Sequence, residues 1–277
     1  MKLAINYSYP AAFLVASRKI QVDYFKTPGW PDLIEQAARL RPVALHFQLD
    51  AGAGRLGHQN WLEFDRWLKR TSTPFINLHL SSSEEVATLT GQKAVTEVNP
   101  LMEVHSLSDC VLEKLLTDVQ SAVRFFGADR VIVENDPYRR PERLASRAAA
   151  LPQTIAAVIE KTGCGLLLDL AHARISAYNL GMTPEEYLAA LPLHRLCEMH
   201  FSGVQTIDGL LQDHYAAEEE DWRLLHWALN QIRAHKWSTP WLLAFEYGGV
   251  GKKFAHRSDS GVILEQSRRL WDMLHEV

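Results

Sequence analysis

Short apolar segments alternate with amphipathic segments along most of the chain, and this alternation constrains the fold more than any other feature. Seven segments have the length and the apolar, β-branched or aromatic content of buried strands: 3–7, 42–49, 74–80, 130–135, 165–170, 195–201 and 240–247. Seven segments have helical periodicity: 31–40, 61–70, 111–127, 142–163, 183–191, 221–235 and 261–277. We expect a weaker eighth strand near 209–214.

Strands and helices that alternate in this way form a parallel sheet covered by helices. Eight repeats in 277 residues match the size of a (β/α)₈ TIM barrel. The chain has no linker rich in Pro, Gly or Ser, so we expect one domain over residues 1–277. A doubly wound open sheet is the alternative, but no G-x-G-x-x-G of the dinucleotide-binding form follows the first strand.

The composition is that of a soluble globular protein, with 47% hydrophobic and 22% charged residues. The net charge of −4 does not favour nucleic acid or an anionic membrane as a partner. No stretch approaches the roughly 20 apolar residues that span a bilayer. Three cysteines without paired spacing and the lack of a clear signal peptide predict a cytoplasmic protein.

Metal-ligating residue types stand at the ends of the predicted strands, which meet on one face of a barrel. These residues are His46, His79, Glu134, Asp169, His172, His200, Asp213, His214 and Glu246. A single histidine in an apolar strand is usually a packed core residue. The prediction of a metal site therefore depends on the recurrence of His, Asp or Glu at the ends of successive strands. Nine imidazole and carboxylate groups exceed what one ion can use, so we expect two or three metal ions.

The segment EYGGVGKKF (246–254) predicts a glycine-rich loop after the last strand. Lys252 and Lys253 are candidates for contact with an anionic substrate. A flexible loop without such a contact is the alternative.

The order of the candidate ligands resembles the xylose isomerase-like superfamily of TIM barrels, which includes endonuclease IV and the sugar isomerases and epimerases. The most specific resemblance is to DUF692, the multinuclear non-heme iron-dependent oxidases. It rests on SAYNLGMTPEEYLAALPLHRLCEMHFSG (176–203) and GLLQDH (209–214), and on VEN, HL and AFEYGG around Glu134, His79 and Glu246. The resemblance is good over residues 130 to 250 and loose over the first third of the chain.

Two positions depart from the DUF692 pattern. His172 stands where that pattern usually has Asn, which is closer to the endonuclease IV arrangement. The Asp-x-His of the pattern is here the adjacent pair Asp213 and His214, so either residue is a candidate ligand.

Three enzyme functions follow from these resemblances. The DUF692 resemblance implies two or three iron ions that bind O₂ and a substrate thiolate, and an oxidoreductase that oxidises a cysteine in a small molecule or peptide. A partner protein that delivers the substrate is a further candidate. The alternatives are a zinc phosphodiesterase of the endonuclease IV type and a mononuclear manganese or magnesium sugar isomerase or epimerase. A metal store without enzymatic activity is a third alternative.

The catalytic candidates are Glu134, Glu246 and His172, and the DUF692 resemblance implies iron in preference to zinc or manganese. A mononuclear epimerase would not account for His46, His79 and the Asp213–His214 pair. The acidic balance of the chain argues against a nucleic-acid substrate. We therefore expect a multinuclear site.

Overall fold

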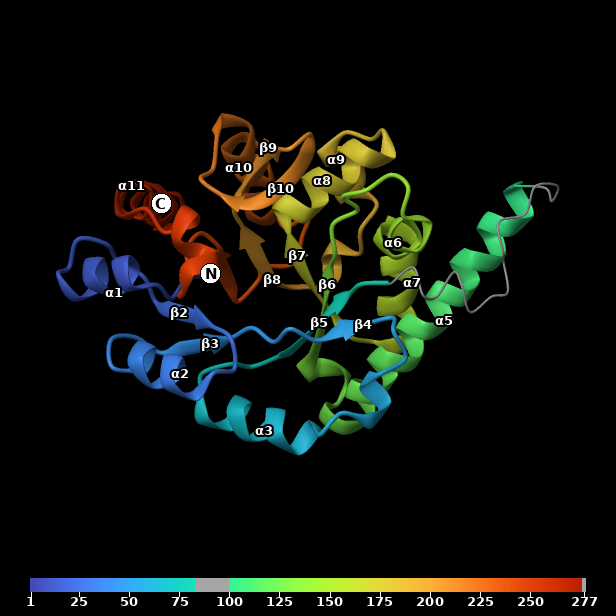
Figure 1. Ribbon diagram of the computed structural model, residues 1–277, viewed down its shortest axis with the longest axis horizontal. Coiled ribbons are helices and arrows are strands. Elements are labelled where there is room, and N and C mark those ends of the chain that lie inside the picture. The colour runs from blue at the N-terminus through green and yellow to red at the C-terminus, as the bar shows by residue number, and fades with distance from the viewer. Residues whose placement is uncertain (83–99, 276–277) are drawn as a thin grey trace.

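The computed structural model describes residues 1–82 and 100–275, which form a parallel sheet surrounded by helices and a separate two-stranded hairpin (Figure 1). The order of strands in the sheet is β3-β2-β1-β11-β8-β7-β6-β5-β4. The bounds are β1 (Lys2–Asn6), β2 (Tyr24–Thr27), β3 (Val43–Leu45), β4 (Asp50–Ala51), β5 (Ile76–Leu80), β6 (Val131–Asn135), β7 (Gly165–Asp169), β8 (Leu196–Phe201) and β11 (Leu242–Phe245).

The two edge strands of this sheet belong to one stretch of chain, residues 43–51. β3 pairs with β2, and β4 pairs with β5, so the stretch closes the sheet into a barrel. The Asn77 side chain on β5 bridges the interruption, because it accepts a hydrogen bond from the Phe47 amide and donates one to the Phe47 carbonyl. With 43–51 counted as one interrupted strand, the barrel has the eight strands of the predicted (β/α)₈ fold.

The helices that surround the barrel are α1 (Tyr9–Ala16), α2 (Pro31–Ala38), α3 (Trp61–Arg70), α5 (Pro100–Phe126), α6 (Leu144–Ala150), α7 (Pro152–Thr162), α8 (Leu170–Leu180), α9 (Pro184–Ala189), α10 (Glu219–Arg233) and α11 (Ser260–His275). Pro152 divides the predicted helix 142–163 into α6 and α7, because the residue before a proline disfavours helical backbone. None of the described helices has both the length and the apolar character needed to cross a membrane.

The strand predicted near 209–214 exists, but its place in the barrel was predicted wrongly. Leu210–Tyr215 forms β10, which pairs only with β9 (Gly203–Ile207) in an antiparallel hairpin among the described residues. The barrel strand that the sequence prediction missed is β2, which has four residues and includes Lys26. The barrel strands between residues 43 and 201 therefore each lie one place later than predicted, whereas β11 keeps the eighth place.

Successive side chains of a strand point to opposite faces of the sheet, and this separates the packed core from the site. On β5, Ile76 and Leu78 pack in the main core, whereas Asn77 and His79 lie on the other face. That other face is the barrel interior, where small residues of neighbouring strands pack at one level. Polar side chains therefore occupy the interior nearer the C-terminal ends of the strands.

Candidate metal centre

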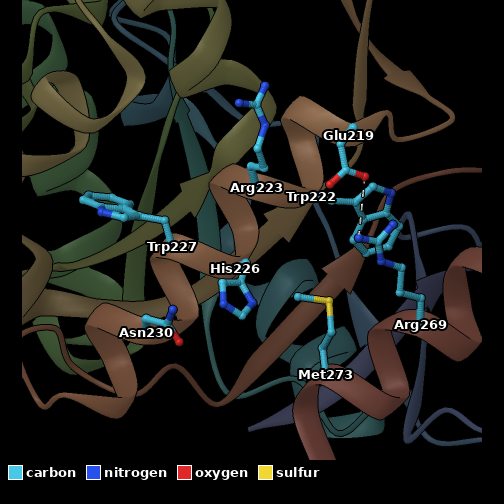
Figure 2. Close-up of a pocket in the computed structure, with 8 residues that line it drawn as sticks. All are labelled: Glu219, Trp222, Arg223, His226, Trp227, Asn230, Arg269 and Met273. Carbon is cyan, nitrogen blue, oxygen red and sulfur yellow. Dashed lines mark ion pairs between the residues drawn. The ribbon is translucent and has the colours of Figure 1, made fainter.

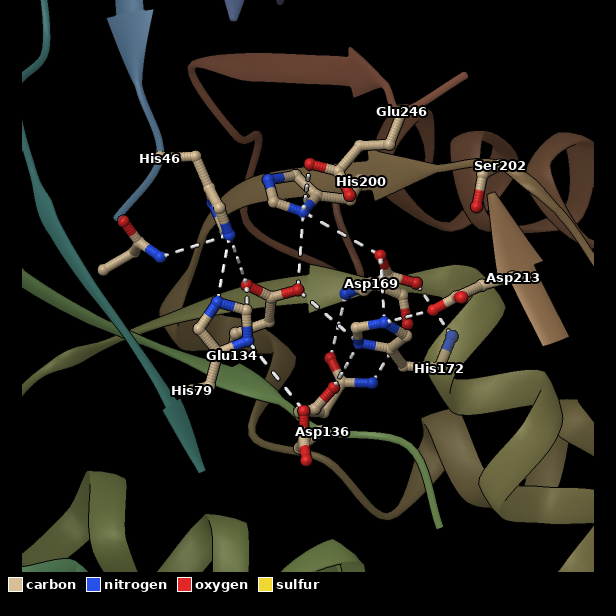
Figure 3. Close-up of polar contacts among 12 residues, drawn as sticks. His46, His79, Glu134, Asp136, Asp169, His172, His200, Ser202, Asp213 and Glu246 are labelled. Carbon is tan, nitrogen blue, oxygen red and sulfur yellow. Dashed lines mark hydrogen bonds and ion pairs between the residues drawn. The ribbon is translucent and has the colours of Figure 1, made fainter. Parts of the chain in front are cut away.

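Seven of the nine predicted ligands converge at or just after the C-terminal ends of the barrel strands: His46, His79, Glu134, Asp169, His172, His200 and Glu246 (Figure 3). The strand register places His79 beside Glu134 and Asp169 beside His200. His46 directly follows β3, and Glu246 directly follows β11. The barrel thus brings together side chains that lie far apart in the sequence.

Three groups of residues each offer three potential ligand atoms, and within each group these atoms lie no more than 4.8 Å apart. The groups are His46–His79–Glu134, His46–His200–Glu246 and Glu134–Asp169–His172. Glu134 and His46 each belong to two groups, so the groups overlap in one cluster of seven residues, which we call the metal cluster. The Nε2 atoms of His46 and His79 are 3.0 Å apart. Two ligand atoms that are each about 2.1 Å from one ion lie roughly 3.0–3.4 Å apart, so this spacing fits metal ligation.

Several buried atoms of the metal cluster have no hydrogen-bond partner. They include Glu134 Oε2, Asp169 Oδ2 and His200 Nδ1, which make no hydrogen bond within the described part of the chain. A buried polar atom without a partner destabilises the fold, and metal ions would satisfy carboxylate oxygens and imidazole nitrogens together. The described residues therefore could hold metal ions.

The carboxylates and imidazoles of the metal cluster shift each other's pKa values. Burial raises the pKa of Glu134, but His79, His200 and His46 together lower it well below its ordinary value. Burial lowers the pKa of His200, but Glu246 and Glu134 raise it to about 10. The negative charge of these carboxylates can be balanced either by protonated imidazoles or by bound metal cations. Metal binding would therefore release protons from the imidazoles.

His46 has the opposite shift. Burial and then Lys26 lower the pKa of His46 well below 6.5, despite the nearby Glu134. A neutral imidazole is the form that binds a metal ion. His46 is therefore already in the ligating state at neutral pH.

His172 lies at the start of α8, a helix that the sequence prediction did not include. Asp169 ends β7 and caps α8 by accepting a hydrogen bond of 2.8 Å from the His172 amide. His172 Nδ1 donates to the Asn135 carbonyl at 2.9 Å, and its Nε2 lies 2.7 Å from Asp213 Oδ2. The ring thus links the metal cluster to the β9–β10 hairpin.

That hairpin brings both Asp213 and His214 to the rim of the metal cluster. Asp213 also accepts a hydrogen bond of 2.6 Å from Arg139. His214 has a φ of 62° and donates from Nδ1 to the Glu246 carbonyl at 3.0 Å. Neither residue belongs to the three groups formed by the described residues.

Sequence reasoning missed a buried ion pair below His200. The Lys26 ammonium contacts both Glu198 and His200 Nε2, and Trp241 donates to the other Glu198 oxygen at 3.0 Å. Lys26 was missed together with β2, which carries it. Glu198 was detectable, because it precedes His200 by two residues on one strand and therefore shares its face.

Asp136 was also missed. It directly follows β6, and its Oδ1 lies 3.9 Å from His79 Nδ1. Burial raises the pKa of Asp136 above its ordinary value. Its position two residues after Glu134 was the available signal.

A cavity of about 690 Å³ opens above the metal cluster. Its lining includes His46, Glu134, His172 and Glu246 of the cluster, and Trp30 from the chain before α2. Lys252 is exposed and does not line this cavity, and the side chain of Lys253 lies outside the described residues. A second hollow, of about 460 Å³ between α10 and α11, contains none of the predicted ligands (Figure 2).

Comparison with known families gives a match over most of the chain. Residues 23–243 match the model of the family described as RiPP precursor modification enzyme MbnB/TglH/ChrH. A UPF0276 protein of Caulobacter vibrioides is 42% identical over 74 residues, which are 27% of this chain and 26% of that protein. A UPF0276 protein of Acaryochloris marina is 28% identical over 72% of this chain and 69% of its own length.

Solved structures share the fold at low sequence identity. D-psicose 3-epimerase of Clostridium cellulolyticum has a TM-score of 0.56 and 11% identity, with 100% of this chain and 99% of that chain covered. Mannonate dehydratase of Streptococcus suis has a TM-score of 0.57 and 10% identity, with 100% and 94% covered. A xylose isomerase domain protein of Alicyclobacillus acidocaldarius has a TM-score of 0.54 and 14% identity, with 99% and 98% covered. These likenesses confirm the predicted xylose isomerase-like TIM barrel.

Proposed function

Because the chain belongs to the family of RiPP precursor modification enzymes MbnB/TglH/ChrH, we propose that it is an iron-dependent oxidase of a peptide cysteine. The overlap of three ligand groups through Glu134 and His46 carries the proposal. A mononuclear site would need only one of these groups, whereas the whole metal cluster can hold two or three ions. The family description supports a peptide substrate.

The proposed reaction transfers electrons from the cysteine to O₂. Bound iron would supply this transfer, because it changes valence between the ferrous and ferric states. A cysteine that loses two electrons and two protons reduces O₂ to hydrogen peroxide, and one that loses four of each reduces O₂ to two molecules of water. Glu134 and His46 keep the ligand groups adjacent, and His172 stays oriented by its bonds to Asn135 and Asp213.

The cavity has the size and lining for such a substrate. Pockets of roughly 300–1,000 Å³ typically bind small ligands, so about 690 Å³ accommodates a cysteine and its neighbours. Trp30, Leu33 and Val250 supply an apolar part of the wall.

Iron and zinc should give opposite results in an oxygen-consumption assay. We expect the iron-loaded protein to consume O₂ when a short cysteine-containing peptide is added, and the zinc-loaded protein to consume none, because zinc does not change valence. An oxygen electrode measures the rate, and elemental analysis of each preparation should give more than one metal ion per chain. The same peptide with serine in place of cysteine is the control.

Two other results would contradict the oxidase proposal. One is zinc-supported cleavage of an abasic-site DNA duplex that is lost in Glu134→Gln. The other is manganese-supported epimerisation of a ketose that is lost in Glu246→Gln. At most one ion per chain after full reconstitution would contradict the multinuclear site.

The His172→Asn variant tests whether the ligand groups of the metal cluster bind their ions separately. His172 belongs to one ligand group, whereas the two groups that contain His46 do not include it. We therefore expect the variant to lose at most one ion and to keep part of the oxygen consumption, as measured by elemental analysis and the oxygen electrode. Loss of all metal would instead make His172 essential to the whole cluster.

A further inference from the structure

The glycine-rich segment after β11 continues into a short 3₁₀ helix, Lys252–Arg257, that reaches the cavity. A Cβ atom on Gly249 would lie 2.7 Å from the Phe254 ring, so only glycine lets this ring pack so closely on the backbone. The Ser258 hydroxyl donates to the Phe254 carbonyl at 2.9 Å. Phe254 is thus held against the loop.

Phe254 in turn holds Arg257, whose guanidinium carbon lies 4.4 Å from the centre of the ring. Arg257 lines the same cavity as Asp213 and Glu246. Its Nε is buried without a hydrogen-bond partner, and its guanidinium forms no ion pair with a described residue. A positioned arginine with unused donors therefore faces the space above the metal cluster.

The other arginine of the cavity is in a different state. Arg139 donates to Asp213 at 2.6 Å and has its charge balanced there. Burial lowers the pKa of Arg257, although Glu246 and Asp213 raise it, and a guanidinium stays charged at neutral pH. Arg257 is therefore the arginine of the cavity whose charge remains available to a ligand.

The ligand chemistry follows from the geometry of the guanidinium. Its planar fork of N–H donors matches a carboxylate, which accepts two parallel hydrogen bonds. Metal ions bound by the metal cluster would reduce the negative field of Glu246 and Asp213 and so favour an anion in the cavity. A neutral ligand group would leave the arginine uncompensated.

We propose that Arg257 binds a carboxylate of the substrate close to the reacting thiol, an inference that rests on the proposed thiol oxidase function. The carboxylate belongs either to a C-terminal residue or to an acidic side chain beside the cysteine. Arg257 thereby selects among cysteine-containing substrates, whereas the metal cluster binds the sulfur.

Three thiol probes test this proposal with the zinc-loaded protein, because zinc is a binding partner of thiolates that does not oxidise them. N-acetylcysteine carries a C-terminal carboxylate, N-acetyl-Cys-Asp-amide carries a side-chain carboxylate, and N-acetylcysteinamide carries neither. Calorimetric titration should give at least about tenfold tighter binding of one or both carboxylate probes than of the amide, because a charge-assisted hydrogen bond is gained. The tighter of the two identifies the source of the carboxylate.

Arg257→Gln should remove this preference while the affinity for N-acetylcysteinamide stays unchanged. Arg257→Lys keeps the charge without the fork and should retain part of the preference. Arg269→Gln is the matched control, because Arg269 packs over Trp222 in the second hollow and should keep the full preference (Figure 2).

Two outcomes overturn the inference in different ways. If all three probes bind the unmodified protein equally, or if Arg257→Gln keeps the preference, Arg257 has no such role and the oxidase proposal stands. If no probe binds the zinc-loaded protein, thiol ligation and the role of Arg257 fail together.

Discussion

Replacing Glu134 with alanine is expected to remove more than one metal ion per chain and to lower oxygen consumption by about 100-fold or more. The reason is that Glu134 belongs to two of the three ligand groups. Its Oε1 lies 3.5 Å from the Nδ1 atoms of both His172 and His200, and its Oε2 lies 3.6 Å from His46 Nε2. Elemental analysis after anaerobic reconstitution with ferrous iron and an oxygen electrode provide the two readouts.

His79→Ala is the matched comparison for Glu134→Ala, because His79 belongs to one group. It should lose at most one ion. Glu186 caps α9 on the surface, and Glu186→Gln should keep the full metal content. If the Glu134→Ala variant holds as many ions as the unmodified protein, Glu134 does not serve as a ligand in two groups.

The fold was predictable because its main determinant is local. The barrel buries the outer face of each strand under helices, and this requires the alternation of apolar runs and amphipathic segments that the sequence shows. The clustering of the candidate ligands followed from the same rule, since parallel strands end at one face. His79 and Glu134 are paired in register for this reason.

Other features depend on contacts that a local pattern does not contain. β2 has no apolar run, because Lys26 points into the barrel and pairs with Glu198 from a strand far along the chain. The interruption between β3 and β4 is bridged by the Asn77 side chain rather than by a continuous strand. Both features required the tertiary structure.

In the loop after β11, too, the sequence pattern did not show which side chain lies in the site. The lysines of this loop were candidates for contact with an anion, but the arginine of this segment that lines the cavity is Arg257, which follows those lysines. Phe254 packs on Gly249 and lies against the guanidinium of Arg257, which lines the cavity. The sequence shows the charges of this loop but not which of them reaches the cavity.

Replacing Lys26 with methionine should destabilise the metal-free protein by about 3–5 kcal/mol, because it leaves the buried Glu198 carboxylate without its counter-charge. The double variant Lys26→Met/Glu198→Gln should recover most of that loss, since a neutral replacement of both partners leaves no unpaired charge. Urea denaturation at pH 7 measures the free energy of unfolding of each protein. Equal stability of the two variants would show that Lys26 does not compensate Glu198.

Acidification provides an independent check on the same ion pair. Burial raises the pKa of Glu198, but Lys26 and His200 lower it from an ordinary value of 4.5 to about 2. A carboxyl whose pKa is lower in the folded state stabilises the fold above pH 4.5, and this contribution, about 3 kcal/mol, is lost as the pH falls toward 2. The stability difference between the unmodified protein and Lys26→Met should therefore narrow between pH 5 and pH 2, because protonation of Glu198 removes the charge that the lysine balances. A difference that stays constant over this range would assign the effect of Lys26 to packing of its side chain instead of to its charge.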